Sequence, residues 1–189
     1  MHEIEPFYNW RQLYIASDDE KSPFYGRKNS EVYFEHQIYN YYIHPQWDYF
    51  GSQTLYTKLL YANYESRYCI LEMFGEWNDV LYNDIMYFYR NVVEHLIDEG
   101  IKYFILIGEN VLNFHSDDDD YYAEWFDNIE DGWIIGVNFR DHVRQEFSDA
   151  FIDRFIGFGG KFNEMKWRNL FPDQLFSTLD SLLMKRLGQ

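Results

Sequence analysis

A helical pattern that ends at a glycine and continues directly into an apolar run is the feature that most constrains the fold of this chain. Gly100 closes the helical pattern, and Ile101–Ile107 follows it as a continuous apolar stretch. Such a stretch is typical of a strand buried on both faces of a sheet. The helical pattern starts after Asn78 or Asp79, either of which suits an N-cap. Its apolar positions are Leu81, Ile85, Phe88, Val92 and Leu96. We therefore predict a helix between residues 78 and 100 and a central strand at Ile101–Ile107.

The segments around this pair alternate between strand and helix patterns. Thr54–Ala62 and Tyr68–Phe74 are rich in β-branched and aromatic residues, and the short stretch between them suits a hairpin. Further along, the pattern predicts helices at Asp119–Ile129 and Asp141–Ala150, strands at Trp133–Asn138 and Phe151–Phe158, and a final helix from Pro172. The order β-β-α-β-α-β-α-β-α is typical of an α/β fold with a mixed, mostly parallel sheet. We expect the central strand to lie between the strands at Tyr68–Phe74 and Trp133–Asn138.

Residues 1–50 differ from this regular part. They are dense in tyrosine and hold three of the four prolines of the chain. A segment of this size and kind buries too little surface to fold alone, so we interpret it as an extension that packs on an α/β domain at residues 51–189 through its aromatic side chains. Phe7, Tyr8, Trp10, Tyr14, Phe24 and Tyr25 are the side chains expected to pack. Glu31–Ile38 is a candidate strand within it.

The charge balance narrows the classes of partner. The chain has 16 Lys and Arg against 32 Asp and Glu, which gives a net charge of -16. This charge repels phosphate backbones and anionic lipid, so we expect no nucleic acid and no membrane as partner. The lone Cys69 lies in an apolar run, and we find neither a signal-peptide pattern nor an apolar span long enough to cross a bilayer. These features favour a cytoplasmic protein.

The order of elements resembles that of the STAS domain, the fold of sulphate transporters and anti-sigma-factor antagonists. Ile70–Glu76 resembles the second strand of that family, Ile101–Ile107 its central strand, and Gly132–Val137 the strand after its second helix. Val111–Ser116 falls where the family has its phosphorylation loop. Ser116 lies near the phosphorylatable position, although His115-Ser116-Asp117-Asp118 replaces the family's Asp-Ser-Ser/Thr-Gly. The chain also resembles bacterial proteins with a similar aromatic-rich extension.

The stretch from His115 to Asp120 is the most suggestive for function. Its closely spaced carboxylates could hold Ca²⁺ or Mg²⁺, or they could favour the N-terminus of the following helix through its dipole. No EF-hand spacing is present, and Gly-x-Ser-x-Gly is absent around Ser116. The sequence therefore assigns no catalytic residue, no metal and no cofactor. Glu109 is a candidate general base because we expect it just beyond the central strand.

Two functional hypotheses remain open from these residues. The first is a non-catalytic regulatory or protein-interaction domain of the STAS-like type. The alternative is a small-ligand-binding protein or enzyme that uses the predicted loop at residues 108–120, with Glu109, His115, Ser116 and Asp117 as binding residues. A second candidate pocket involves His44–Asp48 with neighbouring tyrosines, for which simple packing is the alternative.

Overall fold

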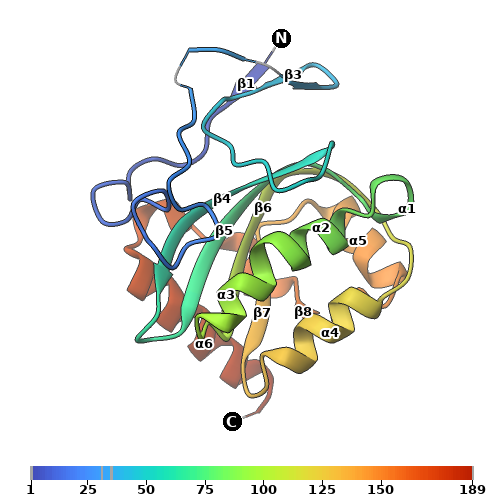
Figure 1. Ribbon diagram of the computed structural model, residues 1–189. Helices are drawn as coiled ribbons and strands as arrows, with labels where there is room; N and C mark the ends of the chain where they lie inside the picture. The colour runs from blue at the N-terminus through green and yellow to red at the C-terminus, as the bar shows by residue number, and fades with distance from the viewer. Residues whose placement is uncertain (1, 31, 35, 189) are drawn as a thin grey trace.

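A computed structural model describes residues 2–30, 32–34 and 36–188. These residues form a five-stranded sheet in the order β4-β5-β6-β7-β8 (Figure 1). Its strands are β4 (Leu55–Asn63), β5 (Tyr68–Asn78), β6 (Tyr103–His115), β7 (Trp133–Val137) and β8 (Ile156–Gly157). The β4 strand is antiparallel to β5, and the other neighbours are parallel. The predicted α/β fold, its hairpin and the central place of β6 between β5 and β7 are confirmed.

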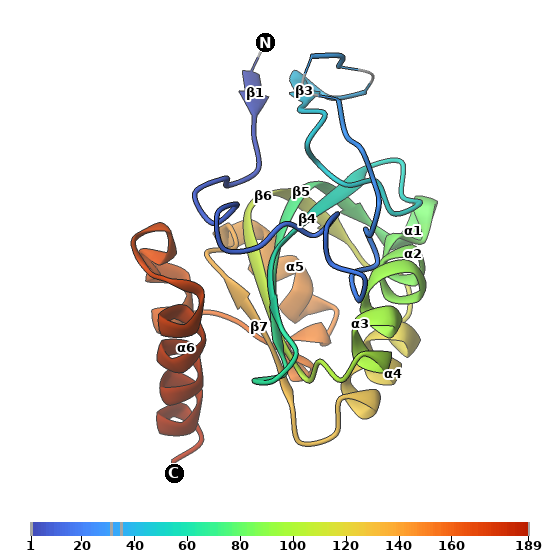
Figure 2. The same cartoon turned by 60° about the vertical axis from the view of Figure 1, so that its left-hand side comes forward.

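Helices cover both faces of this sheet. One face carries α1 (Asp79–Tyr82), α2 (Asp84–Phe88), a π-helical turn (Tyr89–Val93), α3 (Glu94–Asp98), α4 (Asp120–Asn128) and α5 (Asp141–Asp149). The other face carries α6 (Pro172–Arg186), as Figure 2 shows. Short 3-10 turns at Ile152–Arg154, Gly160–Glu164 and Trp167–Asn169 connect the last elements. Among the described residues, no helix has the length and apolar character needed to span a membrane.

The two helical layers explain the unbroken apolar run in β6. Side chains alternate between the faces of a strand, so a strand with both faces covered needs apolar residues at every position. Phe104 and Leu106 pack in the core beneath α2 to α5, whereas Ile105 and Ile107 pack in the core beneath α6. All four side chains are fully buried. Each such side chain contributes about 1.5–3 kcal/mol to folding through removal of apolar surface from water.

The helix predicted between residues 78 and 100 is interrupted. The Asn78 side chain accepts a hydrogen bond from the Leu81 N–H at 2.9 Å and caps α1 as expected. Asn83 then adopts a left-handed φ of 53°, which ends α1 after one turn and starts α2 on a new axis. Asparagine tolerates this conformation better than most residues do. Gly100, at a φ of 94°, follows the end of α3 as predicted.

The strand predicted at Phe151–Phe158 is shorter than expected. Phe151 takes a left-handed φ of 59°, and the chain makes a 3-10 turn before it reaches the sheet. Only Ile156 and Gly157 pair with β7, through Ile134 and Ile135. An edge strand has one hydrogen-bonding partner, so nothing on its outer side extends the pairing.

The first fifty residues contribute a second, smaller sheet. It contains β1 (His2–Ile4), β2 (Gln37–Ile38) and β3 (Tyr41–Ile43) in the order β1-β3-β2. The β1 strand is parallel to β3, and β2 is antiparallel to it. Figure 1 shows this sheet above the large one. The strand predicted at Glu31–Ile38 includes positions 31 and 35, which lie outside the described residues, and β2 forms its last two residues.

Aromatic contacts join this segment to the large sheet. Trp47 is buried and stacks on Phe74 of β5, with ring centroids 5.3 Å apart. Trp10 is buried against Trp167, with centroids 5.6 Å apart. Phe24 is also buried and Phe7 and Tyr14 are half-buried, whereas Tyr8 and Tyr25 are exposed, contrary to the expectation that all six would pack. The segment therefore contributes core residues through part of its aromatic set.

Candidate functional site

The predicted loop at residues 108–120 is largely strand. The β6 strand continues through Gly108 and Glu109 to His115, and it stays paired with β5 as far as Asn78. Apolar Val111 and Phe114 are buried along this continuation. The prediction of a loop was wrong, because the central strand does not end at Ile107 but continues to His115. The missing side chain of Gly108 gives room to Phe139, since a Cβ atom there would lie 2.3 Å from the Phe139 ring.

Glu109 is held by three donors beneath the α6 face. The Nδ2 of Asn138 and the Nε1 of Trp167 each donate to its Oε1 at 2.9 Å, and the Nη1 of Arg168 lies 2.6 Å from its Oε2. Burial alone would raise the pKa of Glu109, but these hydrogen bonds together with the charge of Arg168 outweigh it and lower the pKa. An ionised carboxylate with its lone pairs engaged is a weak general base.

A second carboxylate beside Glu109 escaped the sequence analysis. Glu72 lies on β5 with 1% of its surface exposed, and its Oε2 accepts the backbone N–H of Phe7 at 2.7 Å. Its Oε1 has no hydrogen-bond partner and lies 4.0 Å from Arg168. Burial raises the pKa of Glu72 to about 7, against the lowering effects of Phe7 and Arg168 and with a small rise from Glu109. The signal in the sequence was a single charge within the apolar run of residues 68–74.

His115 lies at the far end of β6. Its Nε2 is 3.0 Å from Oε1 of Glu76, and the hydroxyl of Tyr39 donates to Oε2 of Glu76 at 2.9 Å. The His115 side chain is 47% exposed. His115 lies six positions after Glu109 on the same strand, which corresponds to roughly 20 Å at about 3.3 Å per residue. The candidate residues therefore do not form one site, because Glu109 stands apart from His115, Ser116 and Asp117.

The acidic stretch after His115 is a surface feature. Ser116 is half-buried, and Asp117, Asp118 and Asp120 are exposed. Asp119 stands at the N-cap of α4, yet its side chain makes no cap hydrogen bond and contacts Arg154 instead. No group of three potential metal ligands is found within the described part of the chain.

Apolar side chains are exposed next to this stretch. Val80 and Leu81 of α1 have 56% and 72% of their surface exposed. The α1 helix follows Asn78, the residue paired with His115, and α1 and the segment between β6 and α4 lie on the same side of the molecule in Figure 1. We call Glu76, Val80, Leu81, His115 and Asp117 the strand-end surface.

Buried carboxylates fix α1 in this position. Asp79 accepts hydrogen bonds from the Tyr122 hydroxyl at 2.7 Å and from the Ile85 N–H at 2.8 Å. Asp84 accepts from the Asn78 N–H at 2.8 Å and from the Thr54 hydroxyl at 2.9 Å. Burial raises the pKa of Asp79 to about 7, although the hydrogen bonds from Tyr122 and Ile85 oppose the rise. The hydrogen bonds of Asp79 and Asp84 therefore hold the exposed α1 turn in place.

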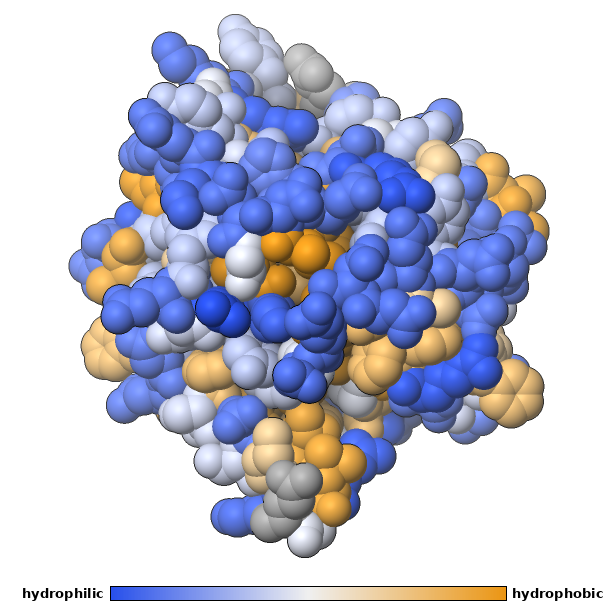
Figure 3. Space-filling view, turned by 60° about the horizontal axis from the view of Figure 1, so that its bottom comes forward, coloured by the Kyte–Doolittle hydropathy of each residue, from blue (hydrophilic) through white to orange (hydrophobic). Residues whose placement is uncertain are grey.

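Two hollows of the molecule lie elsewhere. One cavity of about 520 Å³ lies between the N-terminal segment and β4, and its lining includes His44, Gln46 and Asp48, while Trp47 is used in packing. A second, of about 770 Å³, lies along β7 and β8. Figure 3 shows apolar patches separated by hydrophilic side chains on the lower face. Among their described lining residues, neither cavity includes Glu109, His115, Ser116 or Asp117.

Comparison with known proteins adds no family assignment. No protein-family model matches the chain, and no curated protein matches it significantly.

Proposed function

We propose that this chain is a non-catalytic regulatory or protein-interaction domain of the STAS-like type that acts in the cytoplasm. One observation carries the proposal: His115, Ser116 and Asp117 lie outside both cavities at the end of β6, whose partner residue Asn78 leads into α1 with its exposed Leu81. Substrates and cofactors are usually enclosed in hollows, whereas protein partners bind to open surfaces. The buried Cys69 supports a reducing compartment.

The chemistry of the strand-end surface indicates the kind of partner. Leu81 and Val80 offer apolar area, and Glu76 and Asp117 add negative charge at its border. A polar rim around exposed apolar side chains is typical of interaction surfaces. The complementary partner is a protein segment that combines apolar side chains with Lys or Arg. The net charge of -16 likewise favours a partner that carries Lys or Arg, and it opposes the binding of nucleic acid.

The polar contacts of the candidate residues argue against the alternative of an enzyme. Nε2 of His115 is 3.0 Å from Oε1 of Glu76, and among the described residues no hydrogen bond joins His115 to Ser116. Glu109 is engaged by Asn138, Trp167 and Arg168. A nucleophile needs a neighbouring base that is free to accept its proton.

Affinity capture with a matched pair of variants tests the proposal. The test variant, Leu81→Ser with Asp117→Asn, removes one apolar and one acidic side chain from the strand-end surface. The control, Leu187→Ser with Asp98→Asn, makes the same changes at exposed positions elsewhere. We expect the wild type and the control to retain the same protein partner, the test variant to lose it, and high salt to release it, since salt screens surface charges.

Two outcomes would contradict the proposal. One is a partner that both variants retain equally, which would place the interaction elsewhere. The other is turnover of a small substrate that is lost in His115→Ala, which would make the strand end a catalytic site.

A further inference from the structure

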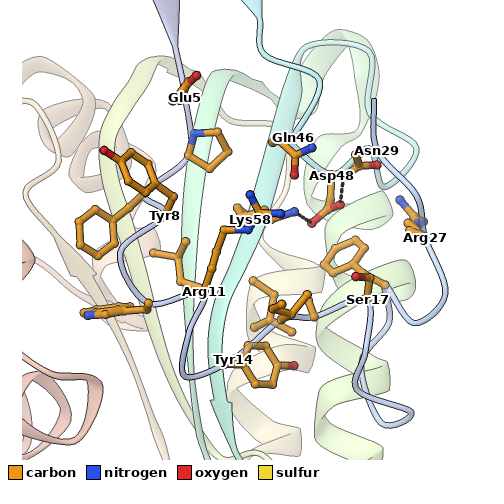
Figure 4. Close-up of a pocket in the computed structure, with 18 of the residues that line it drawn as sticks. Glu5, Tyr8, Arg11, Tyr14, Ser17, Arg27, Asn29, Gln46, Asp48 and Lys58 are labelled. Carbon is orange, nitrogen blue, oxygen red and sulfur yellow. Dashed lines mark hydrogen bonds and ion pairs between the residues drawn. The ribbon is translucent and has the colours of Figure 1, made fainter. Parts of the chain in front are cut away.

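The cavity between the N-terminal segment and β4 has the size of a small-molecule site. Its volume of about 520 Å³ falls within the usual range of roughly 300–1,000 Å³ for ligand pockets. Its lining comes from residues 5–17, 24–29, 44–48 and 58–60. Figure 4 shows these segments around the hollow, with Lys58 between Tyr8 and Arg27.

The apolar part of the lining is already in place. Tyr8 and Ile15 line it with 63% and 39% of their surface exposed, whereas Leu59, Leu60 and Phe24 of the lining are buried. The Trp10 ring is held in place by a hydrogen bond, because its Nε1–H donates to the Leu170 carbonyl at 3.2 Å. A ligand with a flat apolar body would therefore meet a wall that needs no rearrangement, which lowers the entropic cost of binding.

The charged part of the lining is unusual for so acidic a chain. Arg11, Arg27, Lys28 and Lys58 all line the cavity, although acidic residues outnumber basic ones two to one in the sequence. Of these, Arg11, Arg27 and Lys28 form no ion pair with a carboxylate of the described residues. Arg27 donates to the Tyr49 carbonyl and lies over the Phe24 ring, which leaves its charge uncompensated.

The two acids of the lining, Asp48 and Glu5, are fewer than its four Lys and Arg residues. Asp48 is buried, lies 3.1 Å from Nζ of Lys58 within ion-pair distance, and accepts a hydrogen bond from Asn29 at 2.8 Å. Glu5 lies 3.1 Å from Nε2 of His44. Figure 4 shows the contacts of Asp48 at the centre of the cluster, with Arg11 and Arg27 on opposite sides of it. The cavity therefore carries an excess of positive charge.

We propose that this cavity binds a small organic anion that carries an aromatic ring. The phosphate or carboxylate of the ligand pairs with the guanidinium group of Arg11 or of Arg27, because guanidinium groups match the geometry of these anions with paired hydrogen bonds, and Lys28 adds to the positive charge of the lining. The ring packs against Tyr8 and Ile15, the exposed apolar side chains of the lining. This site shares no residue with the strand-end surface, so it stands independently of the interaction proposed there.

Isothermal titration of the whole chain with simple probes tests the proposal. Phenyl phosphate and benzoate carry both features, inorganic phosphate carries the charge alone, and benzyl alcohol carries the ring alone. We expect saturable binding of at least one aromatic anion, weakened by at least about tenfold when either the ring or the charge is missing. Affinity should fall as salt concentration rises, since the cationic side chains are exposed.

Matched variants locate the binding. Arg11→Gln with Lys28→Gln should weaken the preferred aromatic anion by at least about tenfold. Lys161→Gln with Lys185→Gln changes the net charge equally at exposed positions outside the cavity and should leave affinity within about twofold. Arg11→Lys keeps the charge without the planar fork, so it should fall between the wild type and Arg11→Gln.

Three results would overturn the proposal. The first is no binding of either aromatic anion. The second is an equal affinity for inorganic phosphate, which would leave the apolar wall without a role. The third is an equal loss in the Lys161 and Lys185 control, which would reduce the effect to net charge. Circular dichroism of each variant shows whether it is folded, and Arg27→Gln replaces the double variant if that one is not.

Discussion

At the residue scale, the most consequential side chain is a glutamate inside an apolar strand. Glu72 is buried with one oxygen unpaired, and its only short hydrogen bond comes from the Phe7 backbone. Burial destabilises the charged form of this carboxylate by more than Phe7 and Arg168 stabilise it, which is why its pKa rises to about 7. The same residue ties the N-terminal segment to the sheet, so its protonation is coupled to the fold.

This coupling predicts that stability falls as the pH rises. The unfolded chain ionises Glu72 with an ordinary pKa of 4.5, whereas the folded chain keeps the proton up to about 7. Between these values the unfolded state releases the proton first, so the free energy of unfolding declines through this window and stays lower above it. At about 1.4 kcal/mol for each unit of difference between the two pKa values, the decline attributable to Glu72 is about 3 kcal/mol. Glu72→Gln should remove this part of the decline in urea denaturation curves measured at about pH 5 and about pH 8.

Two comparisons make this prediction specific. Glu65→Gln changes an exposed glutamate and should keep the full pH dependence. The pKa of Asp79 is also raised to about 7, so the free energy of unfolding of Glu72→Gln should still decline in part as the pH rises. An unchanged pH dependence in Glu72→Gln would show that the Glu72 carboxyl titrates at an ordinary pKa in the folded chain.

At the element scale, regular patterns were predicted well and irregular ones were not. Strand periodicity and the glycine after α3 located the hairpin, the central strand and most helices. The left-handed Asn83 and the π-helical turn were missed, because they arise from packing against the sheet and leave the helical spacing of apolar residues nearly unchanged. Tertiary contacts likewise decided the length of β6. Of the candidate site residues, the sequence suggested Glu109 and His115–Asp117 together but could not show that Glu109 lies apart from the others.

The close approach of Phe139 to β6 predicts that Gly108 cannot be replaced without cost. A Cβ atom at this position would lie 2.3 Å from the ring, so Gly108→Ala forces the ring or the strand to move. We expect a loss of about 1–3 kcal/mol in the free energy of unfolding, as is usual for overpacked cores. Gly157→Ala is the matched control in β8, because its nearest contact would be an ordinary 3.6 Å. Equal stability of the two variants, measured by chemical denaturation, would contradict the packing of Phe139 against Gly108.

At the scale of the whole molecule, the N-terminal segment takes part in two separate structures. Its tryptophans complete the core on the β4 side of the sheet, and its basic residues line the cavity. The strand-end surface belongs to the regular α/β part instead, where Asp79 and Asp84 hold α1. The molecule therefore presents a cationic hollow and an acidic open surface built from different parts of the chain.

This arrangement predicts how a protease should attack the native chain. Tyr33 and Phe34 are 74% and 41% exposed, whereas Trp10, Phe24 and Trp47 are buried on either side of them. Cleavage requires an exposed, locally open backbone, so chymotrypsin should cut first after Tyr33 or Phe34. The two fragments should remain together on size-exclusion chromatography, because the aromatic contacts of Trp10 and Trp47 with the rest of the chain survive the cut. Mass spectrometry of the eluted peak identifies the site. Release of the fragment that contains Trp10, with a compact remainder left behind, would instead show that the segment is a loosely attached tail.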